Sequence, residues 1–397
     1  MKMERRYIVT PIILIILIIG TLFFINFNSI NNRLASSEKS TPLPTPEGSN
    51  IPEIKKQLLA PPEVVKAIYV TSWSATREDY IDYIFNLARR KKINSVVIDI
   101  KDWSGYVAYD TKVPDVEIYS AKSVRIKNIN SLVQTLHEEQ IYVIARIAVF
   151  QDPRLALARP DLAVHSKSKL ASSTFSSSTL WLDKSGLAWI DPAAKTAWEY
   201  NIAIAKDALS QGFDEINFDY VRFPSDGDLK DMVFPLWDGK TPKHLVIKDF
   251  FKYLRQELPD AKLSVDLFGL STVNFDDLGV GQVIEDAFEY FDYVSPMIYP
   301  SHYAPGFLGY QNPAEYPYEV VKYSMDNALE RLSIYKQMQK RNVQLRPWLQ
   351  DFDLGAVYDA EMIKSEIRAV YDAARENFKG FMLWNSSNIY TEGALEL

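Results

Sequence analysis

Residues 213–227 read FDEINFDYVRFPSDG and place charged residues within a run of strand-like pattern. Ile216 and Phe218 alternate with polar residues, and Val221 follows them, which is typical of a buried strand. Asp219 nevertheless stands in the middle of the run, and Arg222 stands near its end. Because an unpaired ion in an apolar interior is very costly, the strand needs a fold that gives Asp219 a partner or an opening to solvent.

Seven other runs of apolar, β-branched residues resemble this one and predict strands. They cover residues 67–73, 95–103, 142–150, 262–269, 293–300, 344–352 and 380–387. Amphipathic patterns between them predict helices at 77–92, 128–140, 193–212, 244–258, 319–340 and 360–378. Eight strands alternating with helices predict a (β/α)₈ barrel, the TIM-barrel fold, over residues 64–397. The alternative, a doubly wound sheet, usually carries a glycine-rich phosphate turn after an early strand, and the sequence has none.

In a barrel, successive residues of a strand face the axis and the helices in turn. This alternation predicts that polar members of the buried strands face the axis, mostly near the C-terminal ends, where barrel enzymes build their active sites. The residues expected to face inward are Asp99, Lys101, Arg146, Asn217, Asp219, Ser264, Asp266, Tyr299, Arg346, Trp348, Gln350 and Trp384. Asp219 would therefore stand at the mouth of the barrel.

Two carboxylates on adjacent strands, with bases and aromatic rings nearby, are the equipment of glycoside hydrolysis. Asp219 is the predicted nucleophile or base and Asp266 the predicted acid. Arg146 or Arg222 would hold one of them ionised, while apolar burial keeps the other protonated. The predicted substrate-binding residues are Asp99, Lys101, Trp103, Arg146, Asn217, Arg222, Tyr299, Trp348 and Trp384.

Each of these residues also has a structural interpretation. Asp219 and Arg222 could form a buried ion pair, and the tryptophans could fill a wide barrel. Asp99 could orient Lys101 instead of binding substrate. The functional interpretation is favoured because all of these side chains converge on one end of the barrel.

Composition makes other chemistries less probable. The chain of 397 residues has no cysteine, and its four histidines are far apart in sequence and outside the strands, so we expect no metal and no cofactor. The same shortage of histidines weakens a phosphodiesterase or lyase interpretation. Acids and bases are interspersed at a net charge of −7, which gives no indication of a nucleic-acid partner.

The N-terminus predicts a membrane anchor. Lys2, Arg5 and Arg6 precede an uncharged run whose apolar part, residues 8–27, is long enough to cross a bilayer as a helix. We therefore expect an anchor at 1–28, a Ser/Pro/Thr-rich disordered linker at 29–63 and an extracytoplasmic barrel domain at 64–397. A cleaved signal peptide is the alternative.

The stretches KAIYVTSW, VVIDIKDWSGYVAYD, ARIAVFQDP, LSVDLFGL and VSPMIYPSHY, and above all residues 189–227 with WIDPAAKTAWEY and NFDYVRFPSDG, carry a family resemblance. The chain resembles a family of glycoside hydrolase-like barrels of the bacterial envelope, distantly similar to α-amylase-type and other retaining barrels. The resemblance covers residues 64–387 and implies a TIM barrel with carbohydrate-active chemistry. By similarity, Asp219 occupies the nucleophile position on the fourth strand and Asp266 lies on the strand of the acid. The α-amylase-type pattern has Glu where Asp266 stands and Arg where Asn217 stands.

We therefore expect a monomeric, membrane-anchored glycoside hydrolase that acts on an envelope or extracellular polysaccharide. The alternative is a carbohydrate-binding module of the envelope that keeps the barrel without catalysis. Two insertions, residues 165–189 and 224–244, are expected to shape the cleft.

Overall fold

A computed structural model describes residues 62–170, 174–338 and 341–395. The predicted anchor and nearly all of the predicted linker lie outside these residues. Within the described ranges, no helix combines the length and the apolar character needed to span a membrane.

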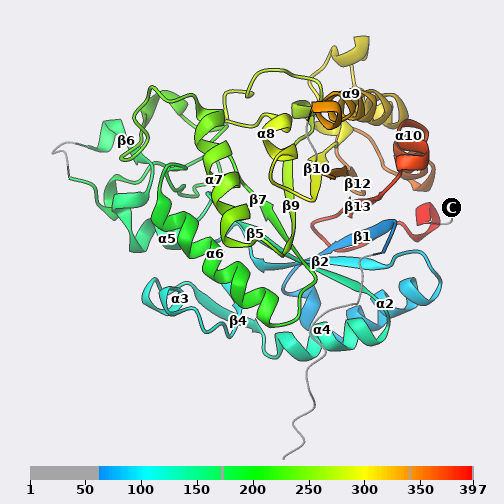
Figure 1. Ribbon diagram of the computed structural model, residues 1–397, viewed down its shortest axis with the longest axis horizontal. Helices are drawn as coiled ribbons and strands as arrows, with labels where there is room; N and C mark the ends of the chain where they lie inside the picture. The colour runs from blue at the N-terminus through cyan, green and yellow to red at the C-terminus, as the bar shows by residue number, and fades with distance from the viewer. Residues whose placement is uncertain (1–61, 171–173, 339–340, 396–397) are drawn as a thin grey trace, which may run out of the picture. The chain divides into compact units, whose positions relative to one another are not determined.

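Eight parallel strands close into a barrel (Figure 1). The closure is made by β1, which pairs with β2 on one side and with β13 on the other. The barrel strands are β1 (Val65–Val70), β2 (Ser95–Lys101), β5 (Tyr142–Ala148), β7 (Glu215–Asp219), β9 (Lys262–Phe268), β10 (Tyr293–Met297), β12 (Trp348–Gln350) and β13 (Gly380–Trp384). Each of them lies within or overlaps one of the eight predicted runs, so the predicted barrel is confirmed.

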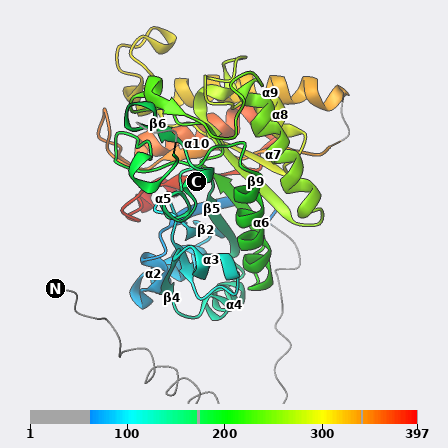
Figure 2. The same ribbon diagram turned by 90° about the vertical axis from the view of Figure 1, so that its left-hand side faces the viewer.

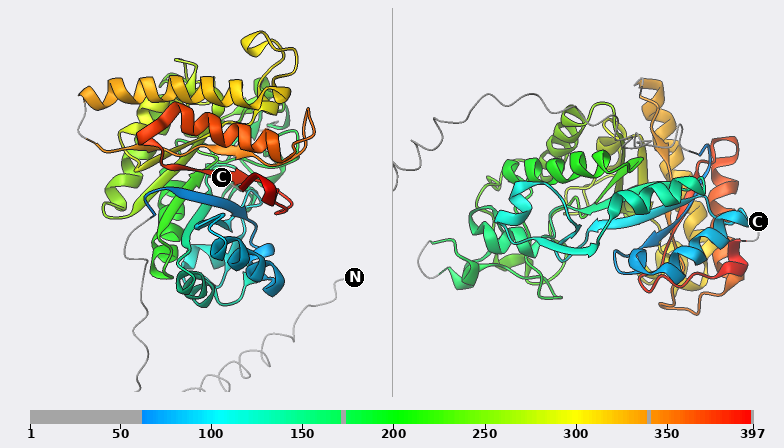
Figure 3. Two further views of the ribbon diagram at one scale, coloured as in Figure 1. Left: turned by 90° about the vertical axis from the view of Figure 1, so that its right-hand side faces the viewer. Right: turned by 90° about the horizontal axis from the view of Figure 1, so that it is seen from below.

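Helices cover the outside of the barrel. They are α2 (Glu78–Arg89), α4 (Ile129–Glu138), α6 (Lys195–Ser210), α7 (Lys243–Glu257), α8 (Ile284–Phe288), α9 (Pro317–Met338) and α10 (Ala360–Ala374). Figure 1 shows α6 and α7 along the outside of β5, β7 and β9, and Figure 3 shows α9 and α10 side by side. The sequence pattern predicted all of these except α8, which has too few residues to show a helical period.

The strand alternation divides the apolar residues into two cores. A small cluster including Ala67, Val97 and Ile144 lies inside the barrel. A much larger cluster, to which Ile216 and Phe218 belong, fills the space between strands and helices. The predicted outward direction of Ile216 and Phe218 is therefore confirmed, and the polar residues between them face the axis.

The seventh predicted strand is interrupted. β11 (Gln344–Leu345) and β12 both pair with β10, and Arg346 and Pro347 separate them. Pro347 has no N–H to donate to the sheet, so it breaks the run of strand hydrogen bonds. The Pro347 carbonyl still accepts a hydrogen bond of 2.9 Å from the backbone N–H of Met382, and the barrel stays closed.

Two excursions leave the barrel. After β2 the chain forms β3 (Val107–Tyr109), α3 (Pro114–Ile118) and β4 (Lys122–Ile126), whose runs are too short for a sequence pattern to predict. After β5 come α5 (Pro153–Ala158) and β6 (His165–Ser166), and β6 pairs antiparallel with β8 (Met232–Val233). Figure 2 shows α5 and β6 on the same side of the barrel. The two insertions at 165–189 and 224–244 thus pack on each other.

Deep in the barrel, Glu215 of β7 and Arg346 form an ion pair in which both side chains are fully buried. A second hydrogen bond joins Arg346 Nη1 to Glu215 Oε2 at 3.3 Å, and the Tyr142 hydroxyl donates to Oε2 at 3.2 Å. Removing these two charges from water costs several kcal/mol, and their mutual attraction offsets this cost only while both charges are present.

We predict that Arg346→Met lowers the free energy of unfolding by about 3–5 kcal/mol, because it leaves the Glu215 carboxylate buried without a counter-ion. The double variant Glu215→Gln with Arg346→Met should recover much of this loss. Urea unfolding followed by circular dichroism measures both. A double variant as unstable as the single one would contradict this explanation.

Candidate active site

A pocket of about 380 Å³ opens at the C-terminal ends of the barrel strands. Its volume lies within the range of small-molecule sites. Residues from six consecutive strand ends line it, together with the loop after β10. They are Arg146, Asp219, Tyr220, Arg222, Asp266, Phe268, Gly269, Leu270, Met297, Tyr299, His302, Tyr303, Trp348 and Trp384. Both predicted catalytic acids thus line one pocket.

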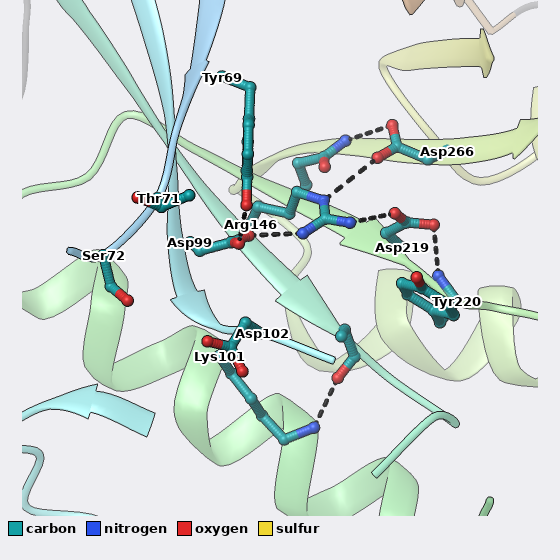
Figure 4. A network of polar contacts seen from close by, with 12 residues as sticks. Tyr69, Thr71, Ser72, Asp99, Lys101, Asp102, Arg146, Asp219, Tyr220 and Asp266 are labelled. Atoms are coloured by element: carbon teal, nitrogen blue, oxygen red, sulfur yellow. Dashed lines mark hydrogen bonds and ion pairs between the residues drawn. The ribbon is translucent and has the colours of Figure 1, made fainter. Parts of the chain in front are cut away.

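The guanidinium of Arg146 lies between three carboxylates (Figure 4). It is ion-paired with Asp99, 2.5 Å from Nη1, and with Asp219 through Nη2. Nε lies 3.9 Å from Asp266 Oδ2, too far for a hydrogen bond. Burial by itself lowers the pKa of Arg146, but the charges of Asp99 and Asp219 outweigh it and raise the pKa well above its usual range. Arg146 is therefore charged at any physiological pH.

Asp219 is held at the point where β7 ends. One carboxylate oxygen accepts from Arg146, and the other accepts from the backbone N–H of Tyr220 at 2.5 Å. Tyr220 has φ +54°, a left-handed conformation that is uncommon for a residue with a side chain. This turn brings the N–H back to Asp219 and places Tyr220 in the lining of the pocket. Arg146 and the Tyr220 N–H thus fix the carboxylate of Asp219 from two sides.

Asp266 has a different environment. Its Oδ1 accepts from Asn217 Nδ2 and from Trp348 Nε1, each at 2.8 Å. The residue is only 1% exposed. Burial, and after it the charge of Asp219, raise the pKa of Asp266 well above its usual range. Since two N–H groups occupy Oδ1, the proton belongs on Oδ2.

Aromatic rings surround the acids. Trp384 stacks on Tyr69 with ring centroids 4.0 Å apart, and the Arg146 guanidinium lies 5.0 Å from the Trp384 ring. Trp384 and Tyr299 line the pocket, as predicted for substrate-binding residues. Trp348 is fully buried, so it contributes an N–H to Asp266 and not an exposed face for a sugar to stack on.

The prediction that Lys101 faces the axis is wrong. The register of β2 shifts between Asp99 and Lys101: Asp99 pairs with Arg146, and Lys101 pairs with the next residue of β5, Ile147. This β-bulge turns Lys101 to the outside of the barrel, as Figure 4 shows. There it is fully buried against Asp152 at 2.8 Å, and it donates to the Ala148 carbonyl at 2.5 Å.

Three other predicted substrate-binding residues lie outside the pocket lining. Asp99 is buried and holds Arg146 and the Tyr69 hydroxyl, so it positions the guanidinium and not Lys101. Asn217 is fully buried beneath Asp266. Trp103 is 49% exposed on the loop after β2.

Arg222 lines the pocket, but it does not pair with Asp219. The carboxylate of Asp219 is paired with Arg146 instead, so the interpretation of Asp219 and Arg222 as a buried ion pair is wrong. No described residue of either insertion lines the pocket. Trp189 of the first insertion lies behind Arg222, with the guanidinium carbon 4.6 Å from the centroid of its ring.

Sequence reasoning did not select Tyr69, Tyr220 or His302. Tyr69 stands one residue before the end of β1 and alternates inward with Ala67, so strand alternation could have found it. Tyr220 follows the strand, and its placement depends on a left-handed turn that leaves no mark in the sequence. Among the described residues, no group of three or more His, Asp or Glu side chains is arranged to hold a metal ion.

A family model described as "Putative glycosyl hydrolase domain" matches residues 67–390. The chain belongs to this family. The resemblance drawn from the sequence is thus confirmed, and with it the assignment of the chain to the glycoside hydrolases. None of the curated proteins searched matches the chain.

Similar solved structures include the following two. The PgaB (BpsB) glycoside hydrolase domain from Bordetella bronchiseptica is 14% identical, with a TM-score of 0.53, over 81% of this chain and 94% of that one. At this identity the likeness shows the barrel fold. A hypothetical protein from Ruminiclostridium thermocellum ATCC 27405 is 39% identical over 50% of this chain and 96% of that one, with a TM-score of 0.45.

We predict that Asp219→Asn lowers the pKa of Asp266. The substitution removes the like charge that helps to raise this pKa, and it releases Arg146 from its ion pair with residue 219. Carbon-13 NMR of carboxyl-labelled aspartate, titrated against pH, measures the change. Asp353→Asn, an exposed acid after β12 that does not line the pocket, should leave the pKa of Asp266 unchanged. An unaltered titration in Asp219→Asn would disprove the coupling.

Proposed function

We propose that this family member hydrolyses a glycosidic bond of an envelope or extracellular polysaccharide, with Asp266 as the acid and Asp219 as the nucleophile or base. The main support for the proposal is the arrangement of the Asp219 and Asp266 pair. The two carboxyl groups line one pocket near one guanidinium, yet their surroundings differ: Asp219 is ion-paired with Arg146, whereas burial and the charge of Asp219 raise the pKa of Asp266. Glycoside hydrolysis needs this difference between its two acids.

Asp266 serves as the acid because it retains its proton above the usual range of a carboxyl group. Its Oδ1 is fixed by Asn217 and Trp348, so Oδ2 is the oxygen that delivers the proton to the departing glycosidic oxygen. As the leaving group departs, the carboxylate that forms is stabilised by the same two N–H donors and by the nearby charge of Arg146.

Asp219 serves as the ionised partner. It attacks the anomeric carbon directly or removes a proton from an attacking water. Arg146 and the Tyr220 N–H stabilise its negative charge while it waits for substrate. Trp384 and Tyr299 supply apolar ring surface beside the acids, on which the C–H faces of a sugar ring can pack.

A carbohydrate-binding module without catalysis is the second candidate. The ion pair between Arg146 and Asp219 favours it, because both oxygens of Asp219 already accept hydrogen bonds. The raised pKa of Asp266 argues against a binding module. A surface that only binds sugars has no need for a buried acid that keeps its proton.

We predict that Asp266→Asn lowers kcat/KM for polysaccharide hydrolysis by roughly 10²- to 10⁴-fold, the usual contribution of a general acid. Asp219→Asn should abolish hydrolysis, and both variants should still bind the glycan. The full-length protein is first screened against envelope polysaccharides by release of reducing ends, and Asp353→Asn is the control. Full activity in both variants would disprove the assignment. Glycan binding without turnover in the unmodified protein would favour the binding module.

We also propose that residues 1–28 anchor the protein in the membrane, with the barrel on the outer side. The support is the apolar run 8–27 after three basic residues. Removal of residues 2–28 should move the protein from the membrane to the soluble fraction after cell lysis. In intact spheroplasts, protease added outside should digest the barrel of the full-length chain. Protection of the barrel until lysis would contradict the orientation.

A further inference from the structure

Arg222 is a buried cation that the proposed chemistry does not use. It is 9% exposed and lines the pocket beside Asp219. Of its five N–H donors, those of Nη1 bind the Phe223 carbonyl at 3.1 Å and the Ser225 hydroxyl at 3.0 Å. Both of these partners are neutral. No described residue accepts a hydrogen bond from Nε or Nη2.

None of the described carboxylates lies within ion-pair distance of Arg222. Arg146, Arg331 and Arg346, the other arginines buried to this degree, are each paired with an acid. Asp219, Asp226 and Asp183 act on Arg222 only at longer range. Burial accordingly lowers the pKa of Arg222 from its usual value, although an arginine remains charged at neutral pH.

Three aromatic rings hold the guanidinium in place. The distances from its carbon to the ring centroids are 4.6 Å for Trp189, 4.7 Å for Phe268 and 5.5 Å for Tyr220. Cation–π contacts make the burial of a guanidinium less costly, but they add no negative charge. Trp189 of the first insertion, Tyr220 after β7 and Phe268 at the end of β9 thus keep a positive charge at the pocket wall without neutralising it.

We propose that Arg222 binds an acidic substituent of the sugar, a carboxylate or a sulfate ester, through its Nε and Nη2 donors. The guanidinium fork matches the planar carboxylate and the sulfate oxygens. This inference rests on the proposed function in one respect: the bound sugar is taken to be the substrate. Arg222 would then select acidic glycans over neutral ones, and Asp219 and Asp266 would carry out the hydrolysis.

The test compares acidic sugars with their neutral parents on the full-length protein. Glucuronate and glucose 6-sulfate are compared with glucose, and N-acetylmuramate with N-acetylglucosamine, by saturation-transfer NMR titration. At least one acidic sugar should bind more tightly than its parent by roughly 10- to 100-fold, the effect of a hydrogen bond to a charged group. An effect with glucuronate or N-acetylmuramate indicates that Arg222 binds a carboxylate. An effect with glucose 6-sulfate indicates that it binds a sulfate ester.

Arg222→Gln should remove the preference, and Arg222→Lys should keep part of it because the charge remains. Arg368→Gln makes the same change of charge at an exposed position on α10 and should leave the preference intact. Thermal unfolding checks that each variant is folded. If none of the acidic sugars binds better than its neutral parent, or if the preference survives in Arg222→Gln, the proposal is overturned.

The Asp266→Asn variant separates this inference from the proposed function. It should lose hydrolysis while its preference for acidic sugars stays. A preference for acidic sugars that depends on Arg222, in a protein that hydrolyses no acidic glycan, would support the binding site and reject the hydrolase. Hydrolysis of neutral glycans alone would support the hydrolase and reject the role of Arg222.

Discussion

Arg146 places one positive charge among three buried carboxylates, and the arrangement of the pocket depends on it. Asp99 and Asp219 are paired with the guanidinium, while Asp266 lies too far from it to form a hydrogen bond. One cation cannot compensate three anions in a dry interior, and burial raises the pKa of both Asp99 and Asp266. The hydrogen-bonded charge of Arg146 opposes the rise at Asp99, whereas the charge of Asp219 adds to it at Asp266, whose pKa lies well above its usual range.

The inward face of β7 explains how a core strand can carry so many polar residues. Glu215, Asn217 and Asp219 follow one another up the axis, and each has its partner elsewhere in the barrel: Arg346 between β11 and β12, Asp266 on β9 and Arg146 on β5. The lowest pair is fully buried and structural. The highest residue lines the pocket. A single strand thus passes from the buried interior of the barrel to the pocket over five residues, because the barrel interior opens at its C-terminal end.

The sequence allowed the barrel and the convergence of Asp219, Asp266 and Arg146 to be predicted, because the period of two along a strand fixes which side chains face the axis. Lys101 was placed wrongly because one extra residue in β2 reverses that alternation, and a bulge has no sequence signature here. The alternative in which Asp219 and Arg222 form an ion pair was also wrong. Whether Arg222 meets Asp219 or aromatic rings depends on how the insertion that carries Trp189 packs against Phe268 at the end of β9, which local patterns do not determine.

The departures from the α-amylase-type pattern become intelligible in the structure. That pattern keeps an arginine two residues before the nucleophile, where this chain has Asn217. Here the guanidinium comes from the adjacent strand, as Arg146 of β5, and it reaches the same carboxylate. Asn217 instead donates to Asp266 and fixes its Oδ1. The shorter Asp in place of Glu is held from the side by Asn217 and Trp348, which leaves Oδ2 as the oxygen that would act on the substrate in the function we propose.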